Sequence, residues 1–171
     1  MWYVVQTRSG EEQKIIMMLN SLDPKEERLD FFVPIYEEVL RSGGKNRISF
    51  KKLFPGYIFI ETKEPERVSD KLKKIPDFSR VLGVREADNS RIFVPVEKSD
   101  EDFLKDLFKD GIMHVSYVKL SKTNRIERVI GPLDRYKNHI TKLEIRHRMA
   151  IVDAEIFGKR RRIKFGLWTD G

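Results

Sequence analysis

The stretch Leu53-Phe54-Pro55-Gly56-Tyr57-Ile58-Phe59-Ile60-Glu61 decides the fold of the first part of the chain. Its Pro-Gly pair is a turn signal, and the five residues after that pair have the aromatic and β-branched character of a strand. Tyr57 and Phe59 share one face of this strand, and the two isoleucines share the other. Since both faces are apolar, one should pack under helices and the other is available to a partner.

The segments around this strand alternate between helical and extended patterns. Ser9 and Glu12 have the spacing of a capping box, so a helix should start there and end before Asp23. Pro34 suggests that its strand is irregular or lies at an edge. Strands are expected over residues 2–7, 31–40, 48–50, 57–61, 80–84 and 91–96, and helices over residues 9–22, 65–75 and 99–108, the last closed by Gly111. This order predicts an α+β sandwich, an antiparallel sheet with helices segregated onto it.

Past Gly111 the pattern changes to a period of two, without a helical stretch. Strands are expected over residues 137–145, 150–156 and 163–167, with a turn at Gly158-Lys159. Their inward positions are apolar, which predicts a small all-β barrel. The expected domains are therefore residues 1–110 and 117–171, joined by a linker over residues 111–116.

The positive charge is concentrated in that second domain. Residues 117–171 contain 14 Lys and Arg against 6 Asp and Glu, whereas residues 1–116 contain 20 against 21. A small module with this charge density is typical of a surface that meets phosphates. The nearly neutral first domain should instead find its partner by shape and apolar contact.

Composition excludes several classes of protein. The chain has no Cys, which removes disulfides, thiolate metal sites and cysteine nucleophiles. The N-terminus lacks the pattern of a signal peptide, and no apolar run approaches the roughly 20 residues of a membrane span. We therefore expect a cytoplasmic protein, without membrane contact and monomeric.

Four motifs in order resemble the NusG family of transcription elongation factors: Trp2-Tyr3-Val4-Val5, Phe54-Pro55-Gly56-Tyr57, Gly131-Pro132-Leu133 and Ile156-Phe157-Gly158. The resemblance covers almost the whole chain. It implies a NusG N-terminal (NGN) domain followed by a KOW domain, an SH3-like barrel. It also implies binding to the clamp helices of the RNA polymerase large subunit, with non-template DNA as a further candidate partner. Carried over by position, the polymerase-binding residues are Trp2, Tyr3, Phe54, Pro55, Gly56, Tyr57 and Phe59.

The second domain departs from the general family pattern in its basic segments. Where the KOW pattern has a glycine this chain has Asn138, a residue that tolerates a left-handed backbone. The departure is similar to the LoaP branch of specialised bacterial NusG paralogues, which promote processive antitermination and recognise an RNA hairpin in the transcript leader. We expect three basic loops on the barrel to bind this RNA, through the following residues: Arg135, Lys137, Asn138 and His139; Arg146, His147 and Arg148; and Lys159, Arg160, Arg161, Arg162 with Lys164.

Other functions find less support in the residues. The chain has no phosphate-binding loop, no His-Glu-x-x-His and no Gly-x-Ser-x-Gly motif, so we expect no catalysis and no cofactor. His139 and His147 have no third ligand nearby, and no metal site is expected. Two alternatives stay open: a general NusG-type factor whose KOW domain binds ribosomal or termination proteins, and a ribosome-associated RNA-binding protein.

Overall fold

The computed structural model describes residues 1–22, 24–25, 27–76 and 92–170. It divides the chain into two compact units that do not follow the chain order. The first unit is Met1–Val33 with Phe54–Glu101, and the second unit is Pro34–Leu53 with Asp102–Gly171. The expected boundaries at residues 110 and 117 remain a prediction about domains, whereas the units assign residues 34–53 to the part that contains the basic segments.

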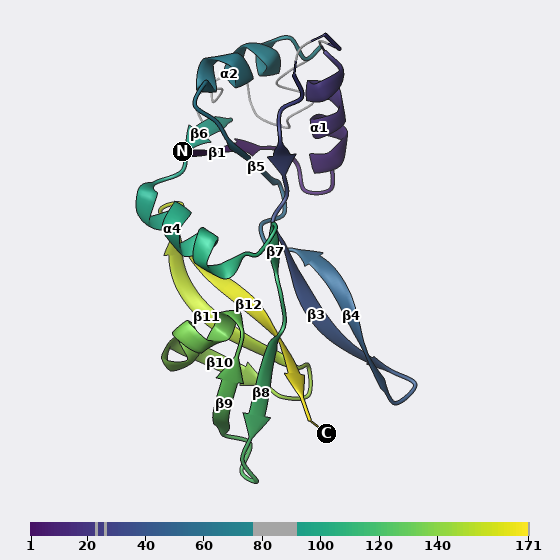
Figure 1. Cartoon of the computed structure of the whole chain (residues 1–171), viewed down its shortest axis with the longest axis vertical. Helices are drawn as coiled ribbons and strands as arrows, with labels where there is room; N and C mark the ends of the chain where they lie inside the picture. The colour runs from purple at the N-terminus through teal and green to yellow at the C-terminus, as the bar shows by residue number, and fades with distance from the viewer. Residues whose placement is uncertain (23, 26, 77–91, 171) are drawn as a thin grey trace. The chain divides into compact units, whose positions relative to one another are not determined.

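The first unit is a four-stranded antiparallel sheet covered by helices on one face (Figure 1). The strand order is β2-β5-β1-β6, with β1 (Trp2–Gln6) and β5 (Tyr57–Glu61) in the centre and β2 (Phe31–Phe32) and β6 (Phe93–Pro95) at the edges. Helices α1 (Glu12–Ser21) and α2 (Pro65–Lys73) supply the periodic apolar residues that cover the sheet. The core beneath them includes Val5, Ile15, Leu19, Ile58 and Leu72, all at most 2% exposed.

The Phe-Pro-Gly-Tyr motif folds as the turn that its residues predict. The Tyr57 amide donates to the Phe54 carbonyl over 3.1 Å. Gly56 has a φ of +84°, which the third position of a type II turn requires. A Cβ on Gly56 would lie 2.7 Å from the Thr7 carbonyl oxygen, so the turn can approach β1 only with glycine there.

Glu12 does not play the capping-box role that its spacing with Ser9 predicts. Helix α1 begins at Glu12 and has no side-chain cap. The Glu12 side chain is fully buried, and its Oε1 accepts a hydrogen bond of 2.7 Å from the Gly56 amide while Oε2 accepts one of 3.0 Å from the Gly10 amide. The carboxylate therefore fastens the start of the helix to the Pro-Gly turn.

The extended run over residues 31–40 is interrupted at Pro34, as its irregularity suggested. After Pro34 the chain enters the second unit and forms the hairpin of β3 (Ile35–Ser42) and β4 (Lys45–Lys52), closed by Gly43 and Gly44. Strand β7 (Ile112–Met113) pairs with β3 in parallel, giving a three-stranded sheet in the order β4-β3-β7. Part of the expected linker is thus a strand of this unit.

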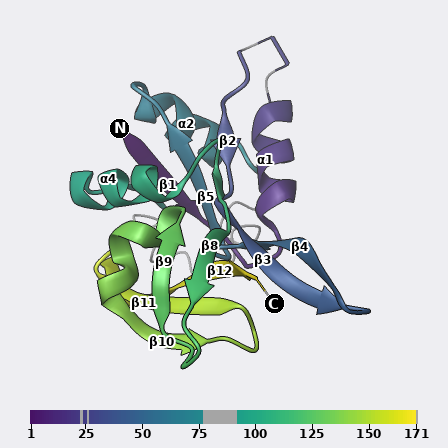
Figure 2. The ribbon, with the colours of Figure 1, turned by 60° about the horizontal axis from the view of Figure 1, so that its bottom comes forward.

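The rest of the second unit is a five-stranded sheet, shown from below in Figure 2. Its order is β10-β11-β12-β8-β9, and only the β12–β8 pair is parallel. The strands are β8 (Ser116–Leu120), β9 (Ile126–Ile130), β10 (Ile140–Glu144), β11 (Met149–Ile156) and β12 (Lys159–Thr169). Their inward side chains, such as Ile163, Phe165 and Leu167, are at most 1% exposed, in agreement with the period of two.

Gly166 marks the place where β12 packs against the β3–β4 hairpin. A Cβ on Gly166 would meet the Glu37 carbonyl oxygen well inside van der Waals contact, with the Cα of Glu38 3.3 Å away. Only glycine lets the two backbones approach so closely. The hairpin is therefore an integral part of the second unit.

The expectation of no helix after Gly111 is wrong, because the Gly-Pro-Leu motif opens a 3-10 helix, η2 (Pro132–His139). The buried Ser116 hydroxyl accepts a hydrogen bond of 3.0 Å from the Leu133 amide and holds the start of η2. Pro132 suits a first helical position, since its missing N–H would have no partner there. The segment reads as extended only because such short helices lack a clear hydrophobic period.

The third predicted helix is α4 (Lys98–Leu107), which ends four residues before the Gly111 expected to close it. The hairpin predicted around residues 80–96 lies mostly outside the described residues. In the described part of the chain, no helix is long and apolar enough to cross a membrane.

Candidate nucleic-acid interface

Three exposed cations of the second unit form a row along β12. Arg160, Arg162 and Lys164 alternate with buried residues and so point to the same side of the strand. Their neighbours on β11 in register are Glu155, Asp153 and Ile151. Arg160 is exposed, but its Nε and Nη2 donate to the Asp153 carboxylate over 3.1 and 2.7 Å. Arg162 and Lys164 are the exposed cations of the row that take no part in this pair.

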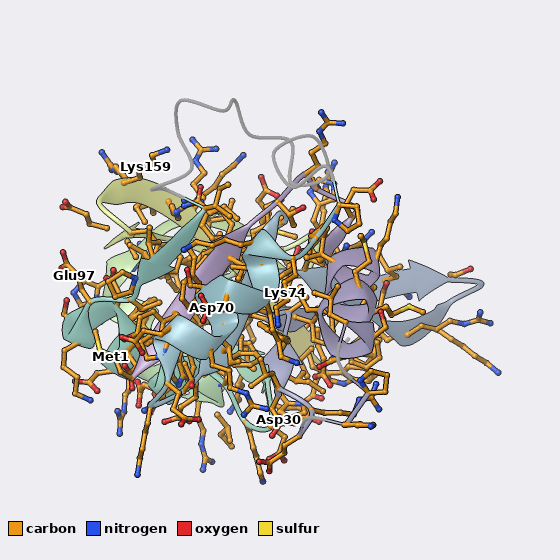
Figure 3. All side chains as sticks on the ribbon, turned by 90° about the horizontal axis from the view of Figure 1, so that it is seen from above. Met1, Asp30, Asp70, Lys74, Glu97 and Lys159 are labelled. Carbon is orange, nitrogen blue, oxygen red and sulfur yellow. The ribbon has the colours of Figure 1, made fainter. Side chains whose placement is uncertain are left out.

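The segment Lys159–Arg162 is strand rather than the turn that its composition suggested. The turn between β11 and β12 consists of Phe157 and Gly158, and Lys159 opens β12 (Figure 3). Arg161 points to the opposite side of the strand from the row, where its guanidinium carbon lies 5.4 Å from the centre of the Phe157 ring. Arg161 is half-buried, so its stem packs against the ring while the charge stays near the surface.

The second predicted segment lies at the other end of β11. Arg146, His147 and Arg148 are in the β10–β11 turn, and β11 spans eight residues between that turn and the β11–β12 turn. At about 3.3 Å per residue the two turns are roughly 23 Å apart. The predicted segments therefore do not converge on one point, and the row on β12 runs between them.

Arg148 differs from its two neighbours in this turn. Arg146 and His147 are exposed, but Arg148 is 7% exposed and has a φ of +51°. Its amide donates to the Ile145 carbonyl and its carbonyl accepts from the Leu167 amide, so its backbone fixes the turn. Arg146 and His147 are the residues that this turn offers to a ligand.

Glu144 lies beside the same turn and is held as a carboxylate. The hydrogen bond from Lys142, together with the charge of Lys142 and the neighbouring His147, lowers the pKa of the Glu144 carboxyl. The His147 Nδ1 is 3.4 Å from a Glu144 oxygen. Lys142, which the sequence analysis did not select, belongs to this group, and its place in β10 opposite Ile151 could be found only from the strand register.

The predicted segment over residues 135–139 belongs to η2, and its cations form ion pairs within the unit. Arg135 forms an ion pair with Asp106, and the Lys137 Nζ is 3.0 Å from Asp134. The Tyr136 hydroxyl donates to Asp106 over 2.9 Å. Burial, this hydrogen bond and the Asp106 charge raise the pKa of Tyr136 to about 12, against a smaller opposing effect of Arg135.

The remaining residues of η2 do not take the backbone that was expected of them. Asn138 has no positive φ and is part of the helix, so the left-handed conformation expected at that position is wrong. Asn138 and His139 are exposed. Among the described residues, no group of three His, Asp or Glu side chains is arranged to hold a metal ion.

The residues predicted to bind polymerase differ in burial within the first unit. Gly56 is buried, Pro55 is exposed, Tyr57 is half-buried, and Tyr3 stacks on Phe93 at 5.1 Å between ring centres. Three more are buried, namely Trp2, Phe54 and Phe59, at 7%, 2% and 0% exposure.

Phe32 completes this aromatic group and was missed by the sequence analysis. Its ring centre is 5.3 Å from that of Trp2 and 5.7 Å from that of Phe59. Register places Phe32 opposite Phe59 and Phe59 opposite Val4, on the sheet face that α1 and α2 do not cover. The pairing of β2 with β5, which joins segments 27 residues apart, is what brings Phe32 there. Besides Tyr3, which packs against the helix-covered core, Phe32, Pro55 and Tyr57 keep exposed surface.

Known proteins are similar to this chain over most of its length. The chain is similar over 163 residues to the transcription termination/antitermination protein NusG of Helicobacter pylori (strain J99), at 21% identity and covering 92% of this chain and 90% of the relative. It is 27% identical to that of Rickettsia prowazekii over 168 residues, covering 92% and 82%. A structure of Thermotoga maritima NusG matches 96% of this chain and 92% of its own length, with 19% identity and a TM-score of 0.45.

The described part of the chain has a mixed α/β fold with a C-terminal region dominated by strands. The family model described as transcription termination factor nusG matches residues 1–104. The chain belongs to the NusG family.

Proposed function

We propose that this chain is a non-enzymatic antitermination factor of the LoaP type. Its first unit holds RNA polymerase, and its second unit binds an RNA hairpin in the leader of a nascent transcript. Tethering through the hairpin raises the local concentration of the factor at the transcribing enzyme, and the polymerase-bound unit then suppresses pausing and terminator response.

The observation that carries the RNA half of the proposal is the exposed cation row on β12. Arg162 and Lys164 alternate along one side of the strand, and Arg146 and His147 are exposed at the turn toward which the row runs. Arg presents a planar fork of donors that suits phosphates and base edges, and each neutralised phosphate releases condensed cations. Arg135 and Lys137 are engaged with Asp106 and Asp134, so they contribute less.

The polymerase half of the proposal rests on family membership and on the aromatic face of the first unit. Phe32, Pro55 and Tyr57 supply exposed apolar surface around the buried Trp2 and Phe59. A modest apolar surface ringed by charge suits a reversible contact with an elongating enzyme. Clamp helices of the large subunit are the proposed target, with non-template DNA as a further one.

The test is the affinity of the full chain for a structured leader RNA over a salt series. With about six phosphate contacts, the logarithm of the association constant should fall with the logarithm of salt with a slope of about −5. A blunt duplex of the same length and base composition is the control. A flat salt response, or equal affinity for hairpin and duplex, contradicts hairpin recognition.

The general NusG-type factor is the second candidate, and the names of the curated relatives favour it. Here the basic residues serve solubility, and the second unit binds a ribosomal or termination protein. The same binding assay with purified termination factor and ribosomes separates the two, because a general factor binds these proteins and discriminates poorly between RNAs.

A further inference from the structure

Three apolar side chains lie in one row across the outer face of the second unit. Trp168 of β12 is in register with Tyr117 of β8, and Tyr117 is in register with Ile130 of β9. Tyr117 is 56% exposed, Ile130 is 55% exposed and Trp168 is half-buried. Their strand neighbours Ser116, Val118, Val129 and Leu167 point inward and are buried, so the core of the unit is complete without this row.

The next positions along the same strands are charged. Lys119 and Arg128 form the adjacent cross-strand pair, and both are exposed. Together with Tyr117, Ile130, Trp168 and Asp170 they line a shallow depression of about 230 Å³. The Lys119 Nζ is 3.7 Å from Glu127, while the exposed Lys122 and Arg125 in the β8–β9 turn add further positive charge.

An exposed aromatic row next to cations has the composition of a surface that stacks nucleobases. Aromatic rings on a sheet accept the flat face of any base, and neighbouring Lys and Arg bind the phosphates. On this surface the cations Lys119, Lys122, Arg125 and Arg128 outnumber the acids Glu127 and Asp170. This sign of charge favours a polyanion over a neutral or basic protein partner, and the flat aromatic faces favour a polyanion that carries bases.

The row also lies on the side of β12 that carries the cation row. Arg160, Arg162, Lys164 and Trp168 are separated by even numbers of residues, so their side chains leave the strand on one side. Trp168 follows Lys164 by four residues, or roughly 13 Å, and the β3 backbone packs against Gly166 between them.

We propose that Tyr117 and Trp168 stack unpaired bases of RNA, with Ile130 packing at their edge and Arg128 and Lys119 binding the adjacent phosphates. This inference rests on the proposed function, because the bases would belong to the single strand that flanks the hairpin bound along β12. The unpaired nucleotides beside the hairpin would then have a binding site of their own, which holds their bases by stacking.

The experiment compares three RNAs with the full chain: a blunt leader hairpin, the same hairpin with six unpaired nucleotides, and an unstructured oligouridine of eight. The row variant, Tyr117→Ser/Ile130→Thr, removes two of the three apolar side chains of the row and keeps Trp168 as the fluorescent reporter. Phe50→Ser/Ile48→Thr is the matched control, since Phe50 and Ile48 are 56% and 37% exposed on the β3–β4 hairpin of the same unit. Stacking on Trp168 should also quench tryptophan fluorescence, and Trp168→Phe should abolish that signal while keeping affinity.

The flank should improve the affinity of the wild-type chain by about tenfold, a stacking contribution of the usual size. Tyr117→Ser/Ile130→Thr should lose this gain and the binding of oligouridine, yet keep its affinity for the blunt hairpin within about twofold. The control variant should keep both.

Failure of the inference is distinguishable from failure of the proposed function. If the blunt hairpin binds but the flank adds nothing, or the row variant keeps the gain, the stacking site is refuted and the proposed function stands. If no hairpin binds, but oligouridine quenches the fluorescence of Trp168 and the row variant abolishes this binding, the stacking site is supported and the proposed hairpin recognition is refuted. If the variant instead loses binding to purified polymerase or ribosomes, or loses self-association in sedimentation, with RNA affinity unchanged, the row is a protein surface and the inference is wrong.

Discussion

The two units of this protein carry charges of opposite sign. The first unit contains 13 Lys and Arg against 16 Asp and Glu, whereas the second contains 21 against 11. This contrast is sharper than the division of the linear sequence at residue 117, because the β3–β4 hairpin brings five cations and two acids into the second unit. The contacts of the folded chain thus add to a separation of charge that the order of the residues already contains.

The units also use their charged residues differently. The first buries Glu12 and Glu101, and both carboxylates accept hydrogen bonds from backbone amides, of Gly10 and Gly56 for Glu12 and of Trp2 for Glu101. The second exposes Arg162 and Lys164 along one side of a strand. A buried carboxylate fixes local structure, while a row of solvated cations is available to a ligand.

Gly166→Val should destabilise the second unit most strongly, because it forces the β3–β4 hairpin away from β12. The new side chain meets the backbone of Glu37 and Glu38, which cannot move as a flexible side chain could. We expect a loss of about 4 kcal/mol in the free energy of unfolding, at the upper end of overpacking effects. Chemical denaturation measures it, with Lys164→Ala as the control on the same strand. A loss below about 1 kcal/mol would show that β3 and β12 do not pack this closely.

Glu12→Ala should destabilise the first unit. The substitution leaves the Gly10 and Gly56 amides without their acceptor, so we expect a loss of about 3 kcal/mol. Gln13→Ala, an exposed neighbour in the same helix, should change stability by less than about 0.5 kcal/mol. Equal small effects of the two substitutions in thermal unfolding would contradict the structural role of Glu12.

Tyr136→Phe should destabilise the second unit by a smaller amount. It removes the hydrogen bond to Asp106 and should cost about 1 kcal/mol near pH 8. The pKa of Tyr136 is raised to about 12 in the folded chain, above the ordinary value of 10, so the stabilising contribution is present below pH 10 and is lost as the pH rises toward 12. The difference in unfolding free energy between wild type and variant should therefore shrink between pH 10 and pH 12. A difference that stays constant over this range would contradict the raised pKa.

Local patterns predicted the first unit well, since its signals lie within single elements. The Pro-Gly turn, the periodic helices and the alternation of β5 are all properties of short stretches. The role of Glu12 was mistaken because its partner Gly56 is 44 residues away. The same reason hid Phe32, whose place depends on the pairing of β2 with β5.

The candidate site was predicted less completely, because composition does not show where a charge points. Lys159–Arg162 reads as a basic loop, but alternation within β12 sends Arg161 away from Arg160 and Arg162. Arg148 looks equivalent to Arg146 in sequence. In the folded turn, however, Arg148 has a left-handed backbone and its side chain is buried. Ion pairs across elements, such as Arg135 with Asp106, likewise depend on the tertiary fold.

The most direct measurement of the central claim is RNA affinity and terminator read-through of the variant Arg160→Gln/Arg162→Gln/Lys164→Gln, beside Lys63→Gln/Lys73→Gln/Lys74→Gln, which removes three exposed cations from the first unit. The β12 variant should lower the salt slope of hairpin binding by about 2 to 3 and abolish read-through, while the first-unit variant should keep both. Hairpin capture and read-through that survive on the β12 variant, or fall equally in the two, would contradict the account.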